Sequence, residues 1–434
     1  MPSILIKNAT IFSNSASGKP VKTDVLCSNG KIENVGKGIL AKAEHKLDAS
    51  GKILMPGLSN CHTHAAMSLL RGYCDDMILQ DWLEKKIWPA EARMDGKAVR
   101  AGTELAALEM IKSGTTFFND MYFQMDSVLE AAEKSGMRAV LGYGMIDMGD
   151  AAKAKKELAI AKAFAKKAKA AKNTLITASM APHSPYTCSK ELLQESHEFA
   201  TKEGLPYHIH ISETRKEVFD VLDKTGKRPV EYLDSIGVLG KNMVAAHCVW
   251  MTLREVELMG RKGAKAILNP GSNLKLASGG VPPLPEMMKA KVGVCLGTDG
   301  AASNNSLSMF EAAKYIALLV KNSRWNASII TAKEAFDFAT AGGYGAFGLN
   351  GGKIEKGALA DLILLDAKAP NLNPATKSTN MYAQVVYAGH AGNVTDSIIG
   401  GKPVMLDGKI LTLDESAVVE TANKEYERVM ASLK

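Results

Sequence analysis

The sequence has no apolar stretch that approaches the roughly 20 residues of a membrane-spanning helix. Its first residues, Met1 to Lys7, alternate like a strand and lack the basic-then-apolar pattern of a secretory signal. The six cysteines include no Cys-x-x-Cys pair, which indicates reduced thiols. These absences predict a cytoplasmic protein that does not interact with a membrane.

The sequence also lacks internal repeats, low-complexity linkers and a general excess of basic charge. The 434 residues are enough for one large barrel with a satellite domain. Residues 151–172 hold eight lysines and one acid, Glu157. The net charge of this segment therefore equals that of the whole chain, +7. Alanine and lysine favour helix, and the segment lacks the interleaved aromatic pattern of nucleic-acid-binding surfaces. We therefore expect an exposed amphipathic helix there and no nucleic-acid partner.

Both ends of the chain have the pattern of β-structure. Asn29-Gly30 and Asp407-Gly408 each separate two apolar runs. Such dipeptides favour tight hairpins because both turn residues need positive φ. We expect residues 1–55 and 355–434 to form one small, discontinuous β-sandwich domain, which ends in a helix over roughly residues 415–433.

Between these ends, helical patterns alternate with short apolar runs. Several of the helices are expected to stop at a glycine, as at Gly114, Gly136 and Gly204. Eight candidate strands begin near residues 53, 115, 138, 175, 207, 244, 266 and 292. Strand–helix alternation implies parallel strands. The pattern predicts an α/β fold with a TIM-like (β/α)8 barrel over residues 56–354.

Two histidines with one residue between them follow the first candidate strand. His62 and His64 come shortly after Pro56 and Gly57, which interrupt the apolar run. Alternate residues of a strand point to the same face, so both imidazoles can reach one ion. Taken alone, such a pair is more often two ordinary core or surface histidines than a metal site.

More ligand-type side chains fall near the carboxyl ends of predicted barrel strands, where barrels of this type carry their chemistry. They are His183 after the fourth strand, His208, His210 and Glu213 at the fifth, His247 at the sixth and Asp299 after the eighth. Each has a structural explanation by itself: His208 as a buried hydrogen-bonded residue, Asp299 as a turn residue, Glu213 as a helix-start carboxylate. Together they predict a metal site, because imidazole and carboxylate ligands suit zinc, iron or another divalent transition ion.

Such a site predicts hydrolytic chemistry. A divalent ion lowers the pKa of a bound water, and the reaction then needs a proton acceptor and a proton donor. Asp299 can contact both ion and water, and Glu213 lies three residues beyond His210, close enough to reach a bound substrate. His247 can hold the hydroxide and balance its charge. We predict catalytic roles for these three: Glu213, His247 and Asp299.

The order His-x-His, His, His, Asp resembles the amidohydrolase superfamily over nearly the whole chain. It is most similar to the 5′-methylthioadenosine/S-adenosylhomocysteine deaminase family. The resemblance implies one divalent ion per chain, zinc first and iron as the alternative, with the ligands His62, His64, His210 and Asp299. Relatives with two metals carry a carboxylated lysine at the end of strand four, where this chain has Ala181-Pro182-His183. A small-molecule nucleoside substrate is implied, and a homo-oligomer is a family expectation.

Further motifs match the nucleoside-deaminase branch. In that branch the tryptophan of Asp81-Trp82-Leu83 packs on the nucleoside, and the glutamate of Trp88-Pro89-Ala90-Glu91 holds the ribose hydroxyls. A carboxylate can accept two hydroxyl hydrogens, and an indole face covers an apolar ligand. Packing of a helix on the barrel is the alternative for both tryptophans. The positions of His183 and Ser303 contact the purine or sugar region in the family.

The chain departs from the family after strand three. Members that accept S-adenosylhomocysteine hold its amino-acid carboxylate with an arginine there. This chain has Tyr143 at the aligned position, as a substrate contact or as plain packing, and no further arginine until Arg215. We therefore expect a small 5′ group, as in 5′-methylthioadenosine, 5′-deoxyadenosine or adenosine, to fit better than S-adenosylhomocysteine.

The predicted function is hydrolytic deamination of such a nucleoside to its inosine analogue and ammonia. One alternative is a triazine-type aminohydrolase or chlorohydrolase on the same scaffold, and another is a non-catalytic protein of the same fold. Trp82 and Glu91 argue against the first because a triazine has no ribose. The complete ligand set argues against the second.

Overall fold

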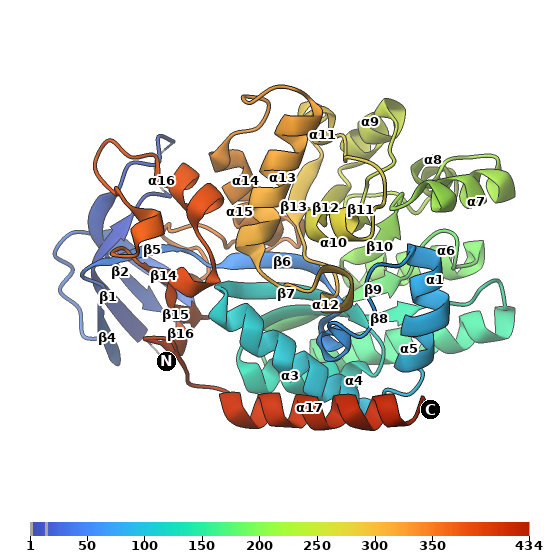
Figure 1. The fold of residues 1–434 in the computed structure, drawn as a ribbon, viewed down its shortest axis with the longest axis horizontal. Coiled ribbons are helices and arrows are strands. Elements are labelled where there is room, and N and C mark those ends of the chain that lie inside the picture. Colours follow the sequence, from blue (N-terminus) through green and yellow to red (C-terminus); the bar gives the residue numbers. More distant parts are fainter. Residues whose placement is uncertain (1–2, 14–15, 434) are drawn as a thin grey trace.

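The computed structural model describes residues 3–13 and 16–433, and its named strands form two sheets (Figure 1). The larger helical part contains an eight-stranded parallel sheet in chain order: β6 (Leu58–Thr63), β7 (Thr115–Tyr122), β8 (Arg138–Met145), β9 (Ile176–Pro182), β10 (Tyr207–Ile211), β11 (Met243–His247), β12 (Lys265–Leu268) and β13 (Gly293–Leu296). The end of β13 returns to β6, where the Asp299 amide donates to the His62 carbonyl oxygen at 2.9 Å. The predicted barrel is therefore confirmed.

Helices cover the outside of this barrel. They are α3 (Gly96–Lys112), α4 (Met125–Ser135), α5 (Ala151–Ala170), α6 (Lys190–Glu203), α7 (Arg215–Thr225), α8 (Pro229–Ser235), α9 (Leu253–Lys262), α10 (Pro270–Lys275), α11 (Leu284–Lys289), α12 (Ala301–Asn304), α13 (Met309–Ser323), α14 (Ala332–Ala339) and α15 (Ala341–Ala346). Asp95, Asp150 and Ser189 accept backbone N–H groups at helix starts. Gly136 and Gly204 end α4 and α6 with positive φ, as glycine allows without strain.

The first barrel strand is β6, which corrects the expectation that it was the run at Ile53–Met55. That run is β5 (Lys52–Pro56), which pairs with β14 (Leu362–Asp366) in the second sheet. The chain passes between the sheets at Gly57, where any side chain would collide with Thr116. His62 therefore lies within a strand and not in the loop after one.

The second sheet has nine strands and contains segments from both ends of the chain. It comprises β1 (Ser3–Ile11), β2 (Val21–Ser28), β3 (Lys31–Gly36), β4 (His45–Asp48), β5, β14, β15 (Val394–Ile399), β16 (Lys402–Leu406) and β17 (Lys409–Ile410). Both predicted hairpin turns are present: φ is 54° at Asn29 and 46° at Asp407, and each is followed by a positive-φ glycine. The predicted domain limits at residues 55 and 355 stay a prediction.

The C-terminal helix α17 (Glu415–Ala431) forms where a helix was expected, but it lies along the barrel beside α3 (Figure 1). Lys112 pairs with Glu415 and Arg428 with Asp95, each at 2.6 Å.

The shorter helical segments are η1 (Ala65–Leu70), α1 (Leu79–Trp82), η2 (Leu83–Ile87), α2 (Trp88–Glu91), η3 (Pro370–Leu372), α16 (Met381–Ala383), η4 (Gln384–Ala388) and η5 (Ala391–Asn393).

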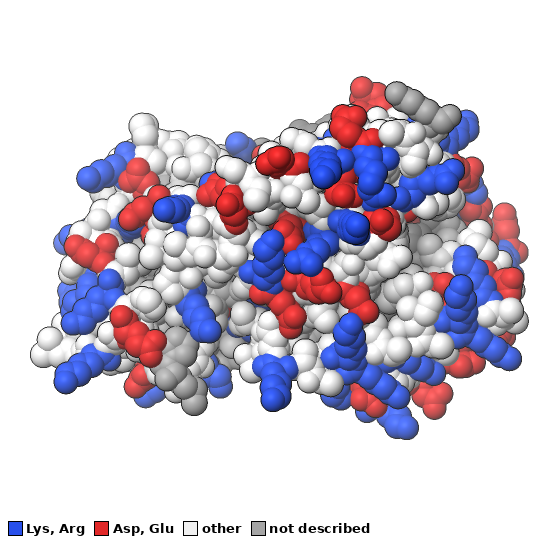
Figure 2. Space-filling model, turned by 90° about the horizontal axis from the view of Figure 1, so that it is seen from below, with Lys and Arg blue, Asp and Glu red and all other residues white. Residues whose placement is uncertain are grey.

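The lysine-rich segment forms α5, as predicted. Leu158 and Phe164 are buried on its inner face, whereas most of its lysines are exposed. Lys167 and Lys169 pair with acids of neighbouring helices. Figure 2 views the molecule from below and shows basic and acidic side chains interspersed over that face.

Among the helices in the described residues, none has the length and apolar character needed to cross a membrane.

Candidate active site and metal centre

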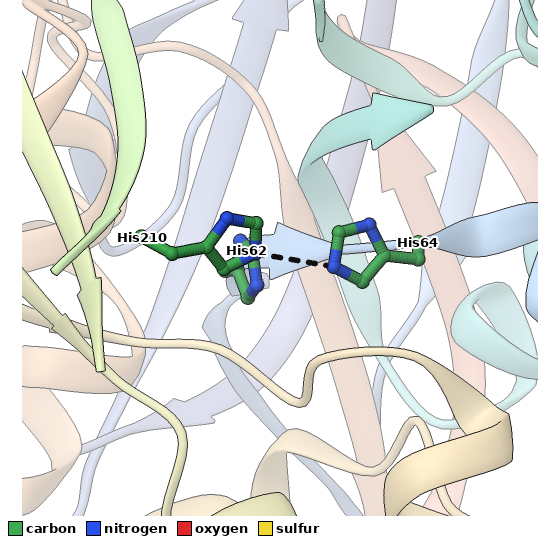
Figure 3. Close-up of side chains that lie close together, drawn as sticks. All are labelled: His62, His64 and His210. Atoms are coloured by element: carbon green, nitrogen blue, oxygen red, sulfur yellow. Dashed lines mark hydrogen bonds between the residues drawn. The ribbon is translucent and has the colours of Figure 1, made fainter. Parts of the chain in front are cut away.

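Side chains from several strands converge at the carboxyl end of the barrel. His62 is on β6, His64 directly follows it, and His210 is on β10. Figure 3 shows the imidazoles of these three residues turned toward one another. His247 ends β11 and Asp299 follows β13, and both lie beside the same cluster. The residues that the sequence predicted as metal ligands are thus brought together.

The hydrogen bonds of His64 and His210 determine which ring nitrogen is free. Nδ1 of His64 donates to the carbonyl oxygen of Met121 at 2.7 Å, and Nδ1 of His210 donates to that of His183 at 2.6 Å. Each neutral ring then has a lone pair on Nε2. These two Nε2 atoms face each other at 3.4 Å (Figure 3). Two lone pairs that converge in this way are suited to binding one cation.

His62 and Asp299 complete the cluster. Nε2 of His62 is fully buried and has no hydrogen-bond partner within the described part of the chain. It lies 3.3 Å from Oδ1 of Asp299, and Nε2 of His64 lies at the same distance from that oxygen. Ligands about 2.0–2.1 Å from a tetrahedral zinc ion are themselves about 3.3–3.4 Å apart. The four side chains therefore fit a divalent metal ion.

Burial favours the neutral forms of His62 and His210, the form in which histidine binds a metal. It lowers the pKa of His62 to about 4 and the pKa of His210 well below its usual value. His208 contacts His62 through a 2.8 Å ring–ring hydrogen bond and is itself contacted by Asn119. His208 thus orients a ligand, in line with its expected place as a buried, hydrogen-bonded residue.

Asp299 is held by two hydroxyl groups. Its Oδ2 accepts from Ser272 at 2.7 Å and from Ser303 at 3.1 Å, and its Oδ1 accepts from the Gly300 amide at 2.9 Å. Sequence reasoning placed Ser303 near the substrate and did not find Ser272. Ser272 lies on α10, and a serine in a short helix after β12 has no sequence pattern that would single it out.

A pocket of about 140 Å³ opens beside the metal ligands. The predicted substrate residues Trp82, Glu91, His183, Glu213 and Ser303 all line it. Its remaining lining is largely apolar and aromatic. Such a pocket, with a few converging polar groups, is typical of a small-molecule site.

Tyr143 does not line this pocket, which corrects the expectation that it contacts the substrate. It lies on the outward side of β8, in a separate cavity with Phe164, and its hydroxyl group is hydrogen-bonded to Glu157. Its neighbour Gly144 faces the pocket instead. Successive residues of a strand point to opposite sides, so the aligned position falls on the wrong face.

Glu91 and Trp82 are held in the loop region after β6. Tyr122 at the end of β7 donates its hydroxyl hydrogen to Glu91 Oε1 at 2.7 Å, and burial raises the pKa of Glu91 to about 7. The Trp82 indole N–H donates to the carbonyl oxygen of Cys74 at 2.9 Å. The sequence analysis did not single out Tyr122, because nothing in the sequence showed that the strand near residue 115 extends as far as Tyr122.

Glu213 and His247 face each other across the pocket. Oε2 of Glu213 lies 3.7 Å from Nε2 of His247. Burial, together with the charge of Asp299, raises the pKa of Glu213 to about 8, so this carboxyl group can carry a proton near neutral pH. The Asn273 side-chain amide donates to Nδ1 of His247 at 3.0 Å, which leaves the hydrogen of the neutral ring on Nε2. His247 therefore presents a donor to the site.

The chain belongs to the amidohydrolase family, whose model matches residues 53–404. A 5′-deoxyadenosine deaminase from Methanosphaera stadtmanae is 44% identical over 421 residues, which cover 97% of each chain. The relative of the same name from Methanocaldococcus jannaschii is 44% identical over 427 residues, 98% of this chain and 99% of the relative.

Solved structures agree with the fold. An adenosine deaminase from Xanthomonas campestris with bound zinc superposes with a TM-score of 0.92 at 32% identity, over 99% of both chains. An atrazine chlorohydrolase from Arthrobacter aurescens, complexed with zinc, superposes with a TM-score of 0.90 over 98% of this chain and 100% of the other. It is only 18% identical, so that similarity extends to the fold alone.

Proposed function

We propose that this chain is a metal-dependent hydrolase that deaminates a 5′-modified adenosine to the inosine analogue and ammonia. The observation that carries the proposal is the cluster of His62, His64, His210 and Asp299 beside a pocket that also contains Glu213 and Glu91. The name that both deaminase relatives carry supports 5′-deoxyadenosine as the first substrate to test. We propose zinc as the ion, with iron as the alternative, and the zinc-bound neighbour supports this choice.

A divalent ion held by these residues supplies a Lewis acid that brings the pKa of water near neutrality. In the proposed reaction the water oxygen bonds to C6 of adenine, N1 takes up a proton, and the C6–N6 bond breaks to release ammonia. Asp299 accepts a proton from the water while its carboxylate stays oriented by Ser272 and Ser303. Glu213 delivers a proton to N1 and then takes the remaining hydroxyl proton from O6, while Asp299 passes the first water proton to N6 so that ammonia can leave. The Nε2 hydrogen of His247 stabilises negative charge on the attacking oxygen.

The 5′ group of the substrate is expected to be small and uncharged. None of the described residues that line the pocket is Lys or Arg. A carboxylate that enters without a cationic partner loses hydration and gains no compensating interaction. We therefore expect kcat/KM for 5′-deoxyadenosine and 5′-methylthioadenosine to equal or exceed that for S-adenosylhomocysteine. Steady-state kinetics on the three purified nucleosides, with the metal content measured in parallel, checks this.

The same panel tests the proposed function as a whole. A metal-loaded protein that releases ammonia from none of the nucleosides would overturn it. A clear preference for S-adenosylhomocysteine would keep the reaction class and show that a basic group outside this pocket reaches the 5′ end. Cytoplasmic location and a homo-oligomeric state stay predictions.

Replacing Glu91 with alanine should lower kcat/KM for nucleosides steeply. Two ribose hydroxyls need a shared acceptor, and each hydrogen bond to a charged group is worth about 1.5–3 kcal/mol, or roughly 10–100-fold. Any activity on adenine, which has no ribose, should change much less. Kinetics with 5′-deoxyadenosine and adenine measure the difference. Asp81→Ala is the matched control, because Asp81 is a half-exposed acid of the same loop region that pairs with Lys85. A similar loss with both variants would contradict ribose recognition by Glu91.

A further inference from the structure

Three helices begin with the same Thr-x-x-Glu pattern, but their glutamates do not make the same contacts. In α9 the Glu255 carboxylate accepts the backbone N–H of Thr252 at 2.9 Å, and in α14 Glu334 accepts that of Thr331 at 2.7 Å. These are capping boxes, in which the third residue of the helix returns to the residue that caps it. The third such helix is α7, and it departs from the pattern.

In α7 the glutamate reaches further back along the chain. Thr214 still caps the helix, because its hydroxyl oxygen accepts the Glu217 amide at 3.2 Å. The Glu217 carboxylate, however, accepts the backbone N–H of Ser212 at 2.6 Å on Oε1 and that of Glu213 at 2.7 Å on Oε2. Both carboxylate oxygens therefore bind the segment that connects the metal ligand strand β10 to the helix, and one of the two amides belongs to Glu213.

This connecting segment has a backbone conformation that needs support. Ser212 has φ of 53°, in the left-handed region that residues with a side chain disfavour. Its carbonyl oxygen accepts the amides of Trp250 at 2.8 Å and Val249 at 3.1 Å, from the segment after β11. The peptide groups around Ser212 are thus bound on one side by that segment and on the other by Glu217. Glu213 follows directly, so its direction depends on this geometry.

Burying the Glu217 carboxylate costs free energy, and a residue that only caps a helix would not need to be buried. Its side chain is buried, and no ion pair among the described residues includes it. Burial raises the pKa of Glu217 to about 7, two backbone N–H groups donate to its carboxylate, and the Glu213 carboxyl group is a near neighbour. A buried carboxylate without an ion-pair partner costs free energy, and such groups are found most often at functional sites.

We propose that Glu217 is a positioning residue for the reaction, which holds the Ser212–Glu213 peptide so that the Glu213 carboxyl group stays in the pocket. The inference rests on the proposed function, in which Glu213 transfers a proton to the substrate. The competing explanation is a helix cap that stabilises the fold and has no influence on Glu213.

Glu217→Gln separates the two explanations. Glutamine has one acceptor oxygen, and its NH2 group would face a peptide N–H, so one of the two hydrogen bonds is lost. We expect kcat for 5′-deoxyadenosine to fall about tenfold or more while KM changes less than about threefold, because general acid catalysis depends on the placement of the acid. The metal content should be unchanged. Glu334→Gln is the control: it alters the capping-box glutamate of α14, which neither lines the pocket nor contacts the Ser212 segment, and it should lower Tm without lowering kcat.

A double-mutant cycle distinguishes a positioning role from a purely structural one. It compares the effect of Glu217→Gln on kcat with and without the Glu213 carboxyl group. If Glu217 acts only through Glu213, then adding Glu217→Gln to the Glu213→Gln variant should lower its residual kcat by less than about twofold. A purely structural defect would lower the rate by the same factor in both backgrounds. An unchanged kcat in Glu217→Gln, or a full additional loss in the double variant, would overturn the proposal.

Two further measurements keep the test decisive. If Glu217→Gln does not fold, Glu217→Asp carries the same comparison, because its side chain is one methylene shorter and cannot reach both amides. If the wild-type protein deaminates no nucleoside, the proposed function fails, and a crystal structure of Glu217→Gln still tests the positioning role. The Glu213 side chain should then have moved out of the pocket, and an unmoved side chain would overturn the inference.

Discussion

Replacing Asp299 or His210 with alanine should reduce deamination to the background rate. Each contributes an atom to a cluster in which neighbouring ligand atoms lie 3.3–3.4 Å apart. Loss of one ligand weakens metal binding, and loss of Asp299 also removes the proposed acceptor of the water proton. Elemental analysis of the purified variants and their kcat with 5′-deoxyadenosine measure both effects. We expect one ion per chain in the wild-type protein and clearly less in the variants.

The matched control for a lost histidine is His197→Ala. His197 is half-buried on α6 and contacts Asn242, outside the pocket. This variant should keep both metal and rate. Two tightly bound ions per chain, or full activity after complete removal of metal, would be incompatible with the proposed centre.

Glu213→Gln should keep the fold and the metal but lose most of kcat. Attack at C6 moves electron density onto N1, which must gain a proton in the same step, and a positioned acid contributes about 10²–10⁴-fold. The carboxyl group is suited to the task because burial raises its pKa to about 8. The amide of glutamine can fill the same space but cannot transfer the proton. Single-turnover and steady-state kinetics, with the metal content determined on the same sample, measure the loss.

Glu203→Gln is the control for the glutamate change, because Glu203 pairs with Lys169 on the surface, at the end of α6. It should leave kcat within about twofold of the wild-type rate, as is usual for surface sites away from the pocket. A Glu213→Gln protein with normal metal content and the wild-type rate would show that another group protonates the substrate.

Local patterns in the sequence were enough to predict the barrel and a cluster of possible metal ligands at one end of it, and the resemblance to the amidohydrolase superfamily supplied the particular ligand set. Parallel strands end at the same edge, so residues near predicted strand ends, such as His210 and Asp299, were expected to meet there. The hairpin turns at Asn29 and Asp407 followed from the conformational preference of their dipeptides. These predictions depend on residue type and short spacing, which a sequence displays directly.

Predictions were wrong where they depended on the exact limits of a strand or on the side of the strand to which one residue points. The run at Ile53–Met55 has the composition of a barrel strand, but it pairs with β14, which lies some 300 positions later. Tyr143 was expected to contact the substrate, yet it lines a separate cavity and points away from the pocket. Alternation shows which residues share a face, but only the packing of distant strands determines which face is inside.

The sequence by itself determined the kinds of chemistry available to this protein: imidazoles, carboxylates and their order along eight strands. Only the tertiary structure decided how they are used. The free nitrogen of His64 depends on the carbonyl oxygen of Met121, and the orientation of Asp299 depends on Ser272. The same Thr-x-x-Glu pattern caps α9 but, in α7, holds the backbone of Glu213. The partners of His64 and Asp299 come from segments that become neighbours only when the barrel closes, because their positions are set by long-range packing.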